Sequence, residues 1–445
     1  MSSDLQSFLK SKHNVTTYPE LLSKVQEYMA NTYESLLSTE LSDADVKLVK
    51  DYIKQYLVTY AIHFDDYSDD ELTDKLFSDM AEYSFLSRLL QSAEKIHLEE
   101  IDINAWNDID LIVNGKKYKS IETFLSPQHA IDIVRRMLQA HGSVIDDGKP
   151  MALGSLAKNI RITALKTPIL DEDIGIAASI RIVHKSALSR ANLALGTATG
   201  GMLDFLACVV RYGISICVAG NTGSGKTSTA SWLMSTLPNE KRIYTIEEGS
   251  REFDLIRRDA NGKPLNSVIH TLTKTTVDKA NDITQEILLD NALRFNPDVI
   301  CVGEMRSREA FAAQEAARTG HTVITTIHSK SAPGAYMRMT TLAKRAYEFN
   351  NETLMKMMVE AFPIIVFQRQ FEDSSRKITE IIEGEDYYNG QLKYRTLFRY
   401  CVDDNGEVDG KIKLEGHFEP VERISERLRN ELIQNGAPKR IADFF

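Results

Sequence analysis

Apolar residues recur every three to four positions through residues 1–95, a spacing that predicts helices. The clearest stripe consists of Val46, Val49, Ile53, Tyr56, Leu57 and Tyr60. Ser42 and Asp45 precede this stripe as a pair of polar residues three positions apart, which is typical of a helix start. The pattern therefore predicts an N-terminal helical extension over residues 1–95.

From about residue 96 the pattern changes to short apolar runs bounded by turn signals. The runs that predict strands are residues 110–113, 116–121, 160–164 and 174–183. Asn114-Gly115, between the first two, is a dipeptide typical of a tight hairpin turn. Ser126 and Pro127 open a predicted helix. This mixture indicates a smaller α+β domain over residues 96–185.

Residues 186–201 are small and polar and end in two glycines, so we interpret them as a linker. Strand-like apolar runs then alternate with helical segments through residues 202–370. The runs are residues 214–219, 242–246, 298–302 and 322–327. This order predicts that residues 202–445 form an α/β domain built on a parallel sheet, with a C-terminal subdomain.

The segment GNTGSGKT, Gly220–Thr227, matches the phosphate-binding loop G-x-x-x-x-G-K-[ST] in full. It stands between a strand-like run and a predicted helix, so backbone amides and a helix N-terminus would face one phosphate. Lys226 is expected to reach the β- and γ-phosphates, and the Thr227 hydroxyl to ligate Mg²⁺. The motif predicts binding of ATP with Mg²⁺ through Gly220, Asn221, Thr222, Gly223, Ser224, Gly225, Lys226, Thr227 and Ser228.

Polar side chains follow the other strand-like runs. Glu247 and Glu248 end one run, Glu304 follows another, and His328 ends a third. Ligands sit at the carboxyl ends of parallel strands, so these side chains are expected to converge on the loop. Hydrolysis needs a group that orients the attacking water, and Glu304 is the first candidate for that role. A solvated glutamate and a structural histidine remain the alternatives.

The charge of the chain is unevenly distributed. Residues 1–100 contain 19 Asp and Glu against 9 Lys and Arg, which accounts for the whole formal charge of −10. We leave open whether these carboxylates form a solvated helical face or a docking surface for a partner. In either case the acidic region would repel phosphates, so broad DNA binding through it is disfavoured.

Targeting and cysteine signals are sparse. No stretch approaches the roughly 20 apolar residues that span a bilayer, and the N-terminus lacks a signal-peptide layout. The four cysteines lie far apart and form no C-x-x-C pair. This spacing favours reduced, buried thiols in a cytoplasmic protein over a zinc module or a disulfide framework.

The order of these motifs closely resembles the secretion-superfamily ATPases. These are hexameric motors of type II and type IV secretion and of type IV pilus assembly or retraction. The matching segments are Gly220–Thr227, Thr245–Glu248, Asn296–Arg306 and Thr319–His328. The resemblance covers about residues 100–430 and implies a RecA-like P-loop ATPase domain.

The resemblance also implies roles for single residues. Glu304 would be the catalytic carboxylate, and Glu247 with Glu248 an acidic box in which Glu248 meets Mg²⁺. His321 and His328 would form a histidine box, and Arg161 and Arg181 would contact the nucleotide from the smaller domain. Arg306 is a further nucleotide-binding candidate. Two departures stand out: the acidic box usually reads Glu-Asp, and Ser307-Arg308 stands where a glycine pair often follows the arginine.

The C-terminal third, including Arg376–Glu383, resembles the tight-adherence pilus motors and the related conjugation ATPases. We therefore expect a homohexamer that works with inner-membrane secretion or pilus platform proteins. It would associate peripherally with the inner face of the cytoplasmic membrane, without sequence-specific binding of nucleic acid. Two alternatives stay open. A RecA-like nucleic-acid motor would need basic, aromatic grooves, and a non-enzymatic nucleotide switch for GTP usually carries an N-K-x-D element, which the sequence lacks.

Overall fold

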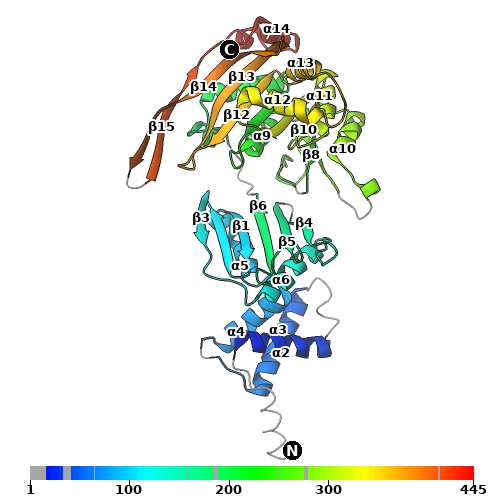
Figure 1. The fold of residues 1–445 in the computed structure, drawn as a ribbon, viewed down its shortest axis with the longest axis vertical. Coiled ribbons are helices and arrows are strands. Elements are labelled where there is room, and N and C mark those ends of the chain that lie inside the picture. The colour runs from blue at the N-terminus through cyan, green and yellow to red at the C-terminus, as the bar shows by residue number, and fades with distance from the viewer. Residues whose placement is uncertain are drawn as a thin grey trace, which may run out of the picture. The chain divides into compact units, whose positions relative to one another are not determined.

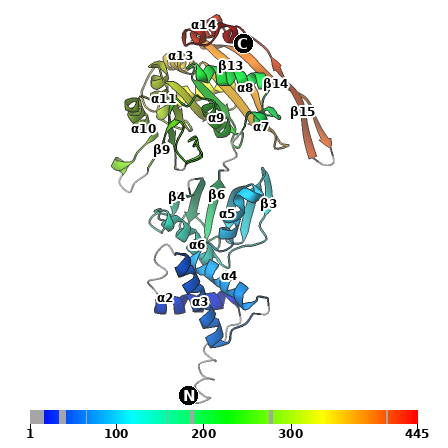
Figure 2. The ribbon, with the colours of Figure 1, turned by 180° about the vertical axis from the view of Figure 1, so that it is seen from behind.

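The computed structural model describes residues 17–33, 42–64, 66–157, 159–183, 189–249, 251–274, 279–408 and 411–445. The chain separates into two compact units, Met1–His184 and Lys185–Phe445. Figures 1 and 2 show the helices and strands of both units from opposite sides. Within the described ranges, no helix combines the length and the apolar character needed to cross a membrane.

Three helices at the start of the first unit share a hydrophobic core of their own. They are α2 (Tyr18–Tyr33), α3 (Asp43–Tyr60) and α4 (Asp69–Ala81). The predicted start of α3 is confirmed, because Ser42 and Asp45 cap each other's backbone amides. Val49 and Ile53, from the predicted apolar stripe, are fully buried in this core.

The next helix, α5 (Phe85–Ile96), belongs to a different core. Its buried residues Phe85, Leu86 and Ala93 pack with side chains of the neighbouring sheet, apart from the core of α2–α4. The domain boundary that we place at residue 95 stays a prediction. The packing of α5 nevertheless groups this helix with the sheet that follows it.

Six antiparallel strands form the sheet of the first unit in the order β3-β2-β1-β6-β5-β4. They are β1 (Leu98–Ala105), β2 (Asp108–Val113), β3 (Lys116–Lys119), β4 (Met151–Ala157), β5 (Ile160–Lys166) and β6 (Ile176–Ile182). The predicted hairpin is confirmed: Asn114 and Gly115 have φ of 50° and 71° between β2 and β3. Helix α6 (Pro127–Ala140) follows the N-cap Ser126, as predicted, and buries its apolar face against the sheet.

The second unit contains a nine-stranded sheet in the order β15-β14-β13-β12-β7-β11-β10-β8-β9. The strands from β12 to β9 run parallel, whereas β13, β14 and β15 are antiparallel additions. The parallel strands are β7 (Ile216–Gly220), β8 (Arg242–Glu247), β9 (Ser267–Leu272), β10 (Val299–Val302), β11 (Thr322–His328) and β12 (Ile364–Gln370). The antiparallel ones are β13 (Arg376–Tyr388), β14 (Gln391–Val408) and β15 (Lys411–Pro420).

Helices cover both faces of the parallel part, which explains why its strands are apolar throughout. Val299 and Cys301 of β10 face one core, and Ile300 and Val302 face the other. The first core is covered by α8 (Gly200–Arg211), α9 (Lys226–Ser235) and α14 (Glu426–Gln434). The second is covered by α11 (Glu309–Arg318), α12 (Ala332–Ala343) and α13 (Asn351–Ala361). Figures 1 and 2 show α12 and α8 on opposite faces.

The remaining elements of the second unit lie in connections and at its end. They are α7 (Arg190–Ala194), η2 (Lys279–Asn281), α10 (Gln285–Ala292), η3 (Leu293–Phe295) and α15 (Lys439–Ala442). The segment predicted as a linker thus contains α7 and the first two residues of α8, Gly200 and Gly201, in its described part. The predicted fold class is confirmed: an α/β P-loop domain of the RecA-like kind follows a smaller α+β domain with an N-terminal helical extension.

Candidate functional site at the carboxyl edge of the parallel sheet

The phosphate-loop segment connects β7 to α9, as its motif requires. Gly223 and Gly225 have φ of 74° and 91°, a left-handed backbone that other residues adopt only with strain. Gly225 is the N-cap of α9 and contributes no capping side chain. The first amides of α9 therefore point to a place where an anion can accept their hydrogen bonds.

The ammonium and hydroxyl groups of the loop also converge. Lys226 is buried, and its Nζ donates to the carbonyl oxygen of Asn221 over 2.8 Å. Ser224 is fully buried, and its hydroxyl donates to the same carbonyl, also over 2.8 Å. These contacts fold the loop back on itself beside the start of α9, where Thr227 and Ser228 lie in the first turn.

Two neighbouring strands, the parallel β12 and the antiparallel β13, hold the loop from the side. A Cβ atom at Gly220 would lie 2.1 Å from the carbonyl oxygen of Gln368 on β12, so only glycine fits there. The buried Gln368 side chain accepts a 2.8 Å hydrogen bond from the Thr229 hydroxyl of α9. Arg376 Nε of β13 donates to the Gly223 carbonyl over 2.9 Å. Sequence reasoning missed Gln368 and Arg376, because no local pattern links them to a loop roughly 140 residues earlier.

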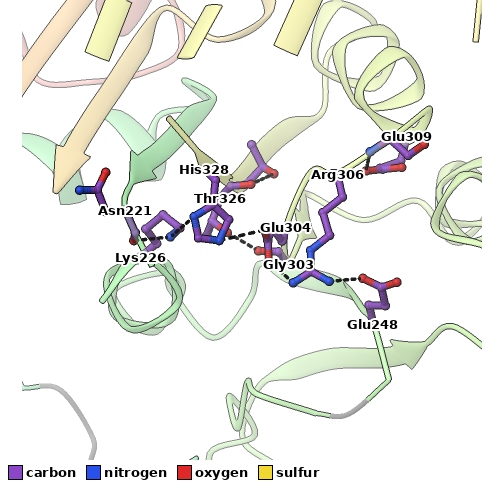
Figure 3. A network of polar contacts seen from close by, with 11 residues as sticks. Asn221, Lys226, Glu248, Gly303, Glu304, Arg306, Glu309, Thr326 and His328 are labelled. Atoms are coloured by element: carbon purple, nitrogen blue, oxygen red, sulfur yellow. Dashed lines mark hydrogen bonds and ion pairs between the residues drawn. The ribbon is translucent and has the colours of Figure 1, made fainter. Parts of the chain in front are cut away.

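The register of the parallel strands brings His328, Glu304 and Glu248 to the same edge of the sheet. His328 pairs with Gly220, and Val302 of β10 pairs with Ile246 of β8, so the chain leaves these strands side by side. Glu304 follows β10 and is fixed by its neighbours, since the Thr326 hydroxyl donates to the Gly303 carbonyl over 2.7 Å. Figure 3 shows the side chains at this edge meeting next to the phosphate loop.

A continuous chain of polar contacts runs through these residues (Figure 3). Lys226 Nζ lies 3.4 Å from His328 Nδ1, and His328 Nε2 lies 3.2 Å from Glu304 Oε1. Arg306 donates from Nη2 to Glu304 Oε2 over 2.7 Å and from Nη1 to Glu248 Oε2 over 2.9 Å. The structure therefore brings together Lys226, His328, Glu304, Arg306 and Glu248, which are far apart in the sequence.

The charges of this network set the protonation of its members. Burial raises the pKa of Glu304, but the hydrogen bond and charge of Arg306, with His328 and Lys226, outweigh burial and hold that pKa below its usual value. Burial and the neighbouring Lys226 lower the pKa of His328, against the opposing effect of Glu304. At neutral pH the site therefore presents an ionised Glu304 and a neutral imidazole.

Glu247 lies next to this network but points away from it. Its carboxylate is buried and accepts hydrogen bonds from the backbone amides of Glu252 and Phe253 and from the Thr245 hydroxyl. These bonds use the carboxylate to hold the chain that follows β8. The expectation that both carboxylates of the pair face the loop is therefore wrong for Glu247, because alternate residues along a strand point in opposite directions.

His321 is likewise not brought to the loop of its own chain. It precedes Thr322, the first residue of β11, whereas His328 is the last residue of the same strand. The two histidines are seven positions apart along the strand, which corresponds to about 23 Å. His321 Nδ1 is buried and has no hydrogen-bond partner within the described part of the chain. A role for His321 at the nucleotide stays a prediction.

Arg161 and Arg181 belong to the first unit, where they are neighbours. They pair directly across β5 and β6, so their side chains leave the sheet on the same face. Two adjacent guanidinium groups form a surface suited to phosphate oxygens. Their predicted contact with the nucleotide remains a prediction.

The groups present fit a triphosphate and Mg²⁺. Uncapped amides at α9 and the buried ammonium of Lys226 suit phosphate oxygens. The hydroxyl of Thr227 and the carboxylates of Glu248 and Glu304 offer only oxygen atoms, the ligands that Mg²⁺ prefers. Arg306 forms ion pairs with both carboxylates, so a metal ion that binds either carboxylate would compete with Arg306.

Known proteins resemble this chain over part of their length. Residues 70–372, more than half of the chain, match the model of the family described as "Type II/IV secretion system protein". An uncharacterized protein of Methanocaldococcus jannaschii is 26% identical over 71% of this chain and 57% of its own length. The type IV secretion system protein PtlH of Bordetella pertussis is 32% identical over 41% of this chain and 53% of its own length. The chain thus spans little more than half of the length of these two relatives.

Among solved structures, the ATPase DotB of Yersinia pseudotuberculosis is 18% identical, with 81% of this chain and 84% of that chain covered and a TM-score of 0.47. The residues that match the family model include the phosphate loop, Glu304 and His328. The chain belongs to the family of type II/IV secretion system proteins.

Proposed function

We propose that the chain is an ATPase whose hydrolysis of ATP powers type IV secretion, conjugation or the assembly of a tight-adherence type of pilus. The observation that carries the proposal is the contact chain from Lys226 through His328 to Glu304 at the carboxyl edge of the sheet. It joins a phosphate-binding cation to an ionised carboxylate. Membership of the secretion family supplies the process to which hydrolysis would be coupled.

In the proposed reaction, the amides of the loop and Lys226 hold the β- and γ-phosphates and offset the negative charge that develops on them. Thr227 and Glu248 would hold Mg²⁺, which would neutralise part of the negative charge of the phosphates. Glu304 orients a water molecule toward the γ-phosphorus and takes a proton from it. Its lowered pKa keeps it ionised at neutral pH, the state that a base requires.

His328 and Arg306 position Glu304 in this scheme. The imidazole of His328 lies between Lys226 and Glu304. A γ-phosphate that binds Lys226 would therefore also change the contact between His328 and Glu304. Arg306 binds Glu304 and Glu248 at once, and it must release at least one carboxylate when a metal ion approaches. The site would thus have one arrangement without metal and another with it, as a motor needs.

We further propose that the motor acts as a homohexamer at the inner face of the cytoplasmic membrane, with platform proteins of a secretion or pilus system as partners. Residues 1–95 would form an acidic extension, 96–185 the smaller domain, 186–201 the linker, and 202–445 the ATPase domain with its C-terminal subdomain. Arg161 and Arg181 of the smaller domain would contact the nucleotide. His321 would be a further nucleotide contact.

The experiment that tests the proposal compares ATP turnover by the full chain and by Lys226→Ala. We expect the variant to fold and to lose measurable turnover, while Lys344→Ala, which changes a lysine at the C-terminal end of α12, retains it.

Light scattering with and without nucleotide measures the oligomeric state. Stimulation by vesicles of acidic phospholipid supports the secretion motor, and stimulation by single-stranded DNA would favour a nucleic-acid motor instead. Undiminished turnover by folded Lys226→Ala would refute the assignment of the site.

A further inference from the structure

The antiparallel ribbon of β14 and β15 carries a group of metal-binding side chains that lies outside the nucleotide site. Cys401, His417 and Glu419 each offer one ligand atom, and these atoms all lie within 4.8 Å of one another. In the register of the ribbon, Cys401 of β14 pairs directly with His417 of β15, and Glu419 follows two residues later. All three side chains therefore leave the same face of the ribbon.

A fourth side chain joins them because the ribbon is irregular at this point. Pairing shifts between Val402 and Asp404, which leaves Asp403 as an extra residue on β14. Such a bulge turns a side chain out of the regular alternation. Asp403 Oδ2 lies 2.8 Å from His417 Nδ1, so the carboxylate holds one ring nitrogen and fixes the plane of the imidazole.

Gly416 allows the two strands to approach closely beside the group. A Cβ atom at this position would lie 2.3 Å from the Cys401 carbonyl oxygen and 2.6 Å from the Tyr400 hydroxyl. Glycine in a strand interior weakens pairing unless close approach requires it. Gly416 therefore allows close approach of the two strands next to the facing pair Cys401 and His417, although glycine is unfavourable in strands.

The setting of Cys401 differs from that of the other cysteines. Cys208, Cys217 and Cys301 are buried in the cores, where burial raises the pKa of each thiol. Cys401 is only half-buried, and its thiol is hydrogen-bonded to Glu419. The side chain of His417 is 58% exposed, so an ion from solvent can reach the group.

We propose that Cys401, His417 and Glu419 bind one Zn²⁺ ion, with Asp403 fixing the imidazole. Thiolate, imidazole and carboxylate are together the ligands typical of zinc, whereas Mg²⁺ takes oxygen ligands alone. Binding replaces the thiol proton of Cys401, which passes to solvent, with a sulfur–zinc bond. A carboxylate on the other ring nitrogen of a ligating histidine is a frequent companion of such sites.

The ion would add a link between two strands that backbone hydrogen bonds, the Asp403–His417 contact and the Tyr400–Phe418 ring contact already join. β15 is the edge strand of the nine-stranded sheet, and the ribbon that it forms with β14 reaches beyond the helices of its unit (Figure 1). A cross-strand ligand pair fixes the register at the bulge, where pairing is weakest. The zinc site therefore stabilises the ribbon and takes no part in ATP hydrolysis.

The test titrates the full, reduced and metal-free chain with Co²⁺ in buffer that contains Mg²⁺, followed by Zn²⁺. We expect one equivalent of Co²⁺ to give the charge-transfer band of a cobalt–thiolate bond, and Zn²⁺ to remove it. Cys401→Ser should abolish the band, His417→Gln and Glu419→Gln should weaken binding more than about tenfold, and Asp403→Asn should weaken it about 10- to 100-fold. Circular dichroism verifies that each variant folds.

Two control variants separate this site from others. Glu415→Gln changes an exposed carboxylate on the same ribbon that contacts only Lys413 in the described structure, and it should leave Co²⁺ affinity unchanged. Glu304→Gln should keep the thiolate band, because the band arises at the ribbon. Absence of the band in the wild-type chain at stoichiometric Co²⁺, or its persistence in Cys401→Ser, would overturn the proposal. So would a band that Cys401→Ser removes while His417→Gln and Glu419→Gln bind with wild-type affinity.

Discussion

Glu304 is the residue whose charge matters most in the proposed reaction. Replacing it by Gln keeps the size of the side chain but removes the negative charge that accepts a proton from water. We expect Glu304→Gln to bind ATP with nearly wild-type affinity, since the loop amides and Lys226 provide most of that affinity. Hydrolysis in a single turnover should slow roughly 10²- to 10⁴-fold, which corresponds to about 3–5 kcal/mol of barrier.

The neighbouring glutamates provide the comparison for this measurement. Glu248→Gln should reduce hydrolysis through the metal site, whereas Glu247→Gln should mainly destabilise the fold, because the Glu247 carboxylate accepts backbone amides. Glu315→Gln, on the exposed face of α11, should match the wild type. Hydrolysis by Glu304→Gln within a few-fold of the wild type, beside an inactive Glu248→Gln, would move the catalytic role to Glu248.

Gln368 is predicted to position the phosphate loop without touching the nucleotide. Gln368→Ala removes the buried acceptor of the Thr229 hydroxyl and leaves that hydroxyl unpaired, which costs about 1–3 kcal/mol. The N-terminal turn of α9 should loosen, so the KM for ATP should rise more than kcat falls. Gln391→Ala, at the exposed start of β14, is the matched control. An unchanged KM in Gln368→Ala would contradict a positioning role.

At the scale of elements, β13 is packed against α12 so closely that one of its residues must be glycine. A Cβ atom at Gly384 would lie 2.3 Å from the hydroxyl of Tyr336, which is fully buried and donates to the Phe362 carbonyl. Gly384→Ala should therefore destabilise the second unit by about 1–3 kcal/mol. Gly406→Ala on β14, where the added methyl meets only ordinary contacts, should be nearly neutral. Urea denaturation followed by fluorescence compares the two variants. Equal denaturation midpoints would show that β13 can shift to accommodate the added methyl group, which would contradict the prediction.

At the scale of the whole molecule, the packing of α5 sets where the chain can be shortened. Deleting residues 1–82 removes the separate core of α2–α4, and we expect the remainder to fold and to retain ATP turnover. Deleting residues 1–96 also removes Phe85 and Leu86 from the core of the sheet, where each contributes about 1.5–3 kcal/mol. This longer deletion should lower the thermal midpoint and the yield of soluble protein. Equal stability of the two truncated chains would place α5 outside the core.

The sequence by itself determined the features whose cause is local. The helix start at Ser42, the Asn114-Gly115 hairpin and the strand–loop–helix around Lys226 each depend on residues only a few positions apart. Strands β1, β4, β9 and β12–β15 were not predicted. β1 alternates apolar and acidic residues, and β4 is rich in small residues, so neither forms a clear apolar run.

The tertiary structure alone decided which of the predicted residues meet. Strand register places His328 beside Lys226 and Glu304 but leaves His321 at the other end of the same strand. Strand alternation turns Glu247 inward and Glu248 toward Arg306. The same is true of Cys401 and His417: sixteen residues separate them in sequence, which hides them from a search for closely spaced ligands, and antiparallel pairing makes them neighbours. Helix caps and turns depend on residues that are close in the sequence, so the sequence alone predicts them. The site depends on the register of strands that are far apart in the sequence, and this register is fixed only when the sheet packs.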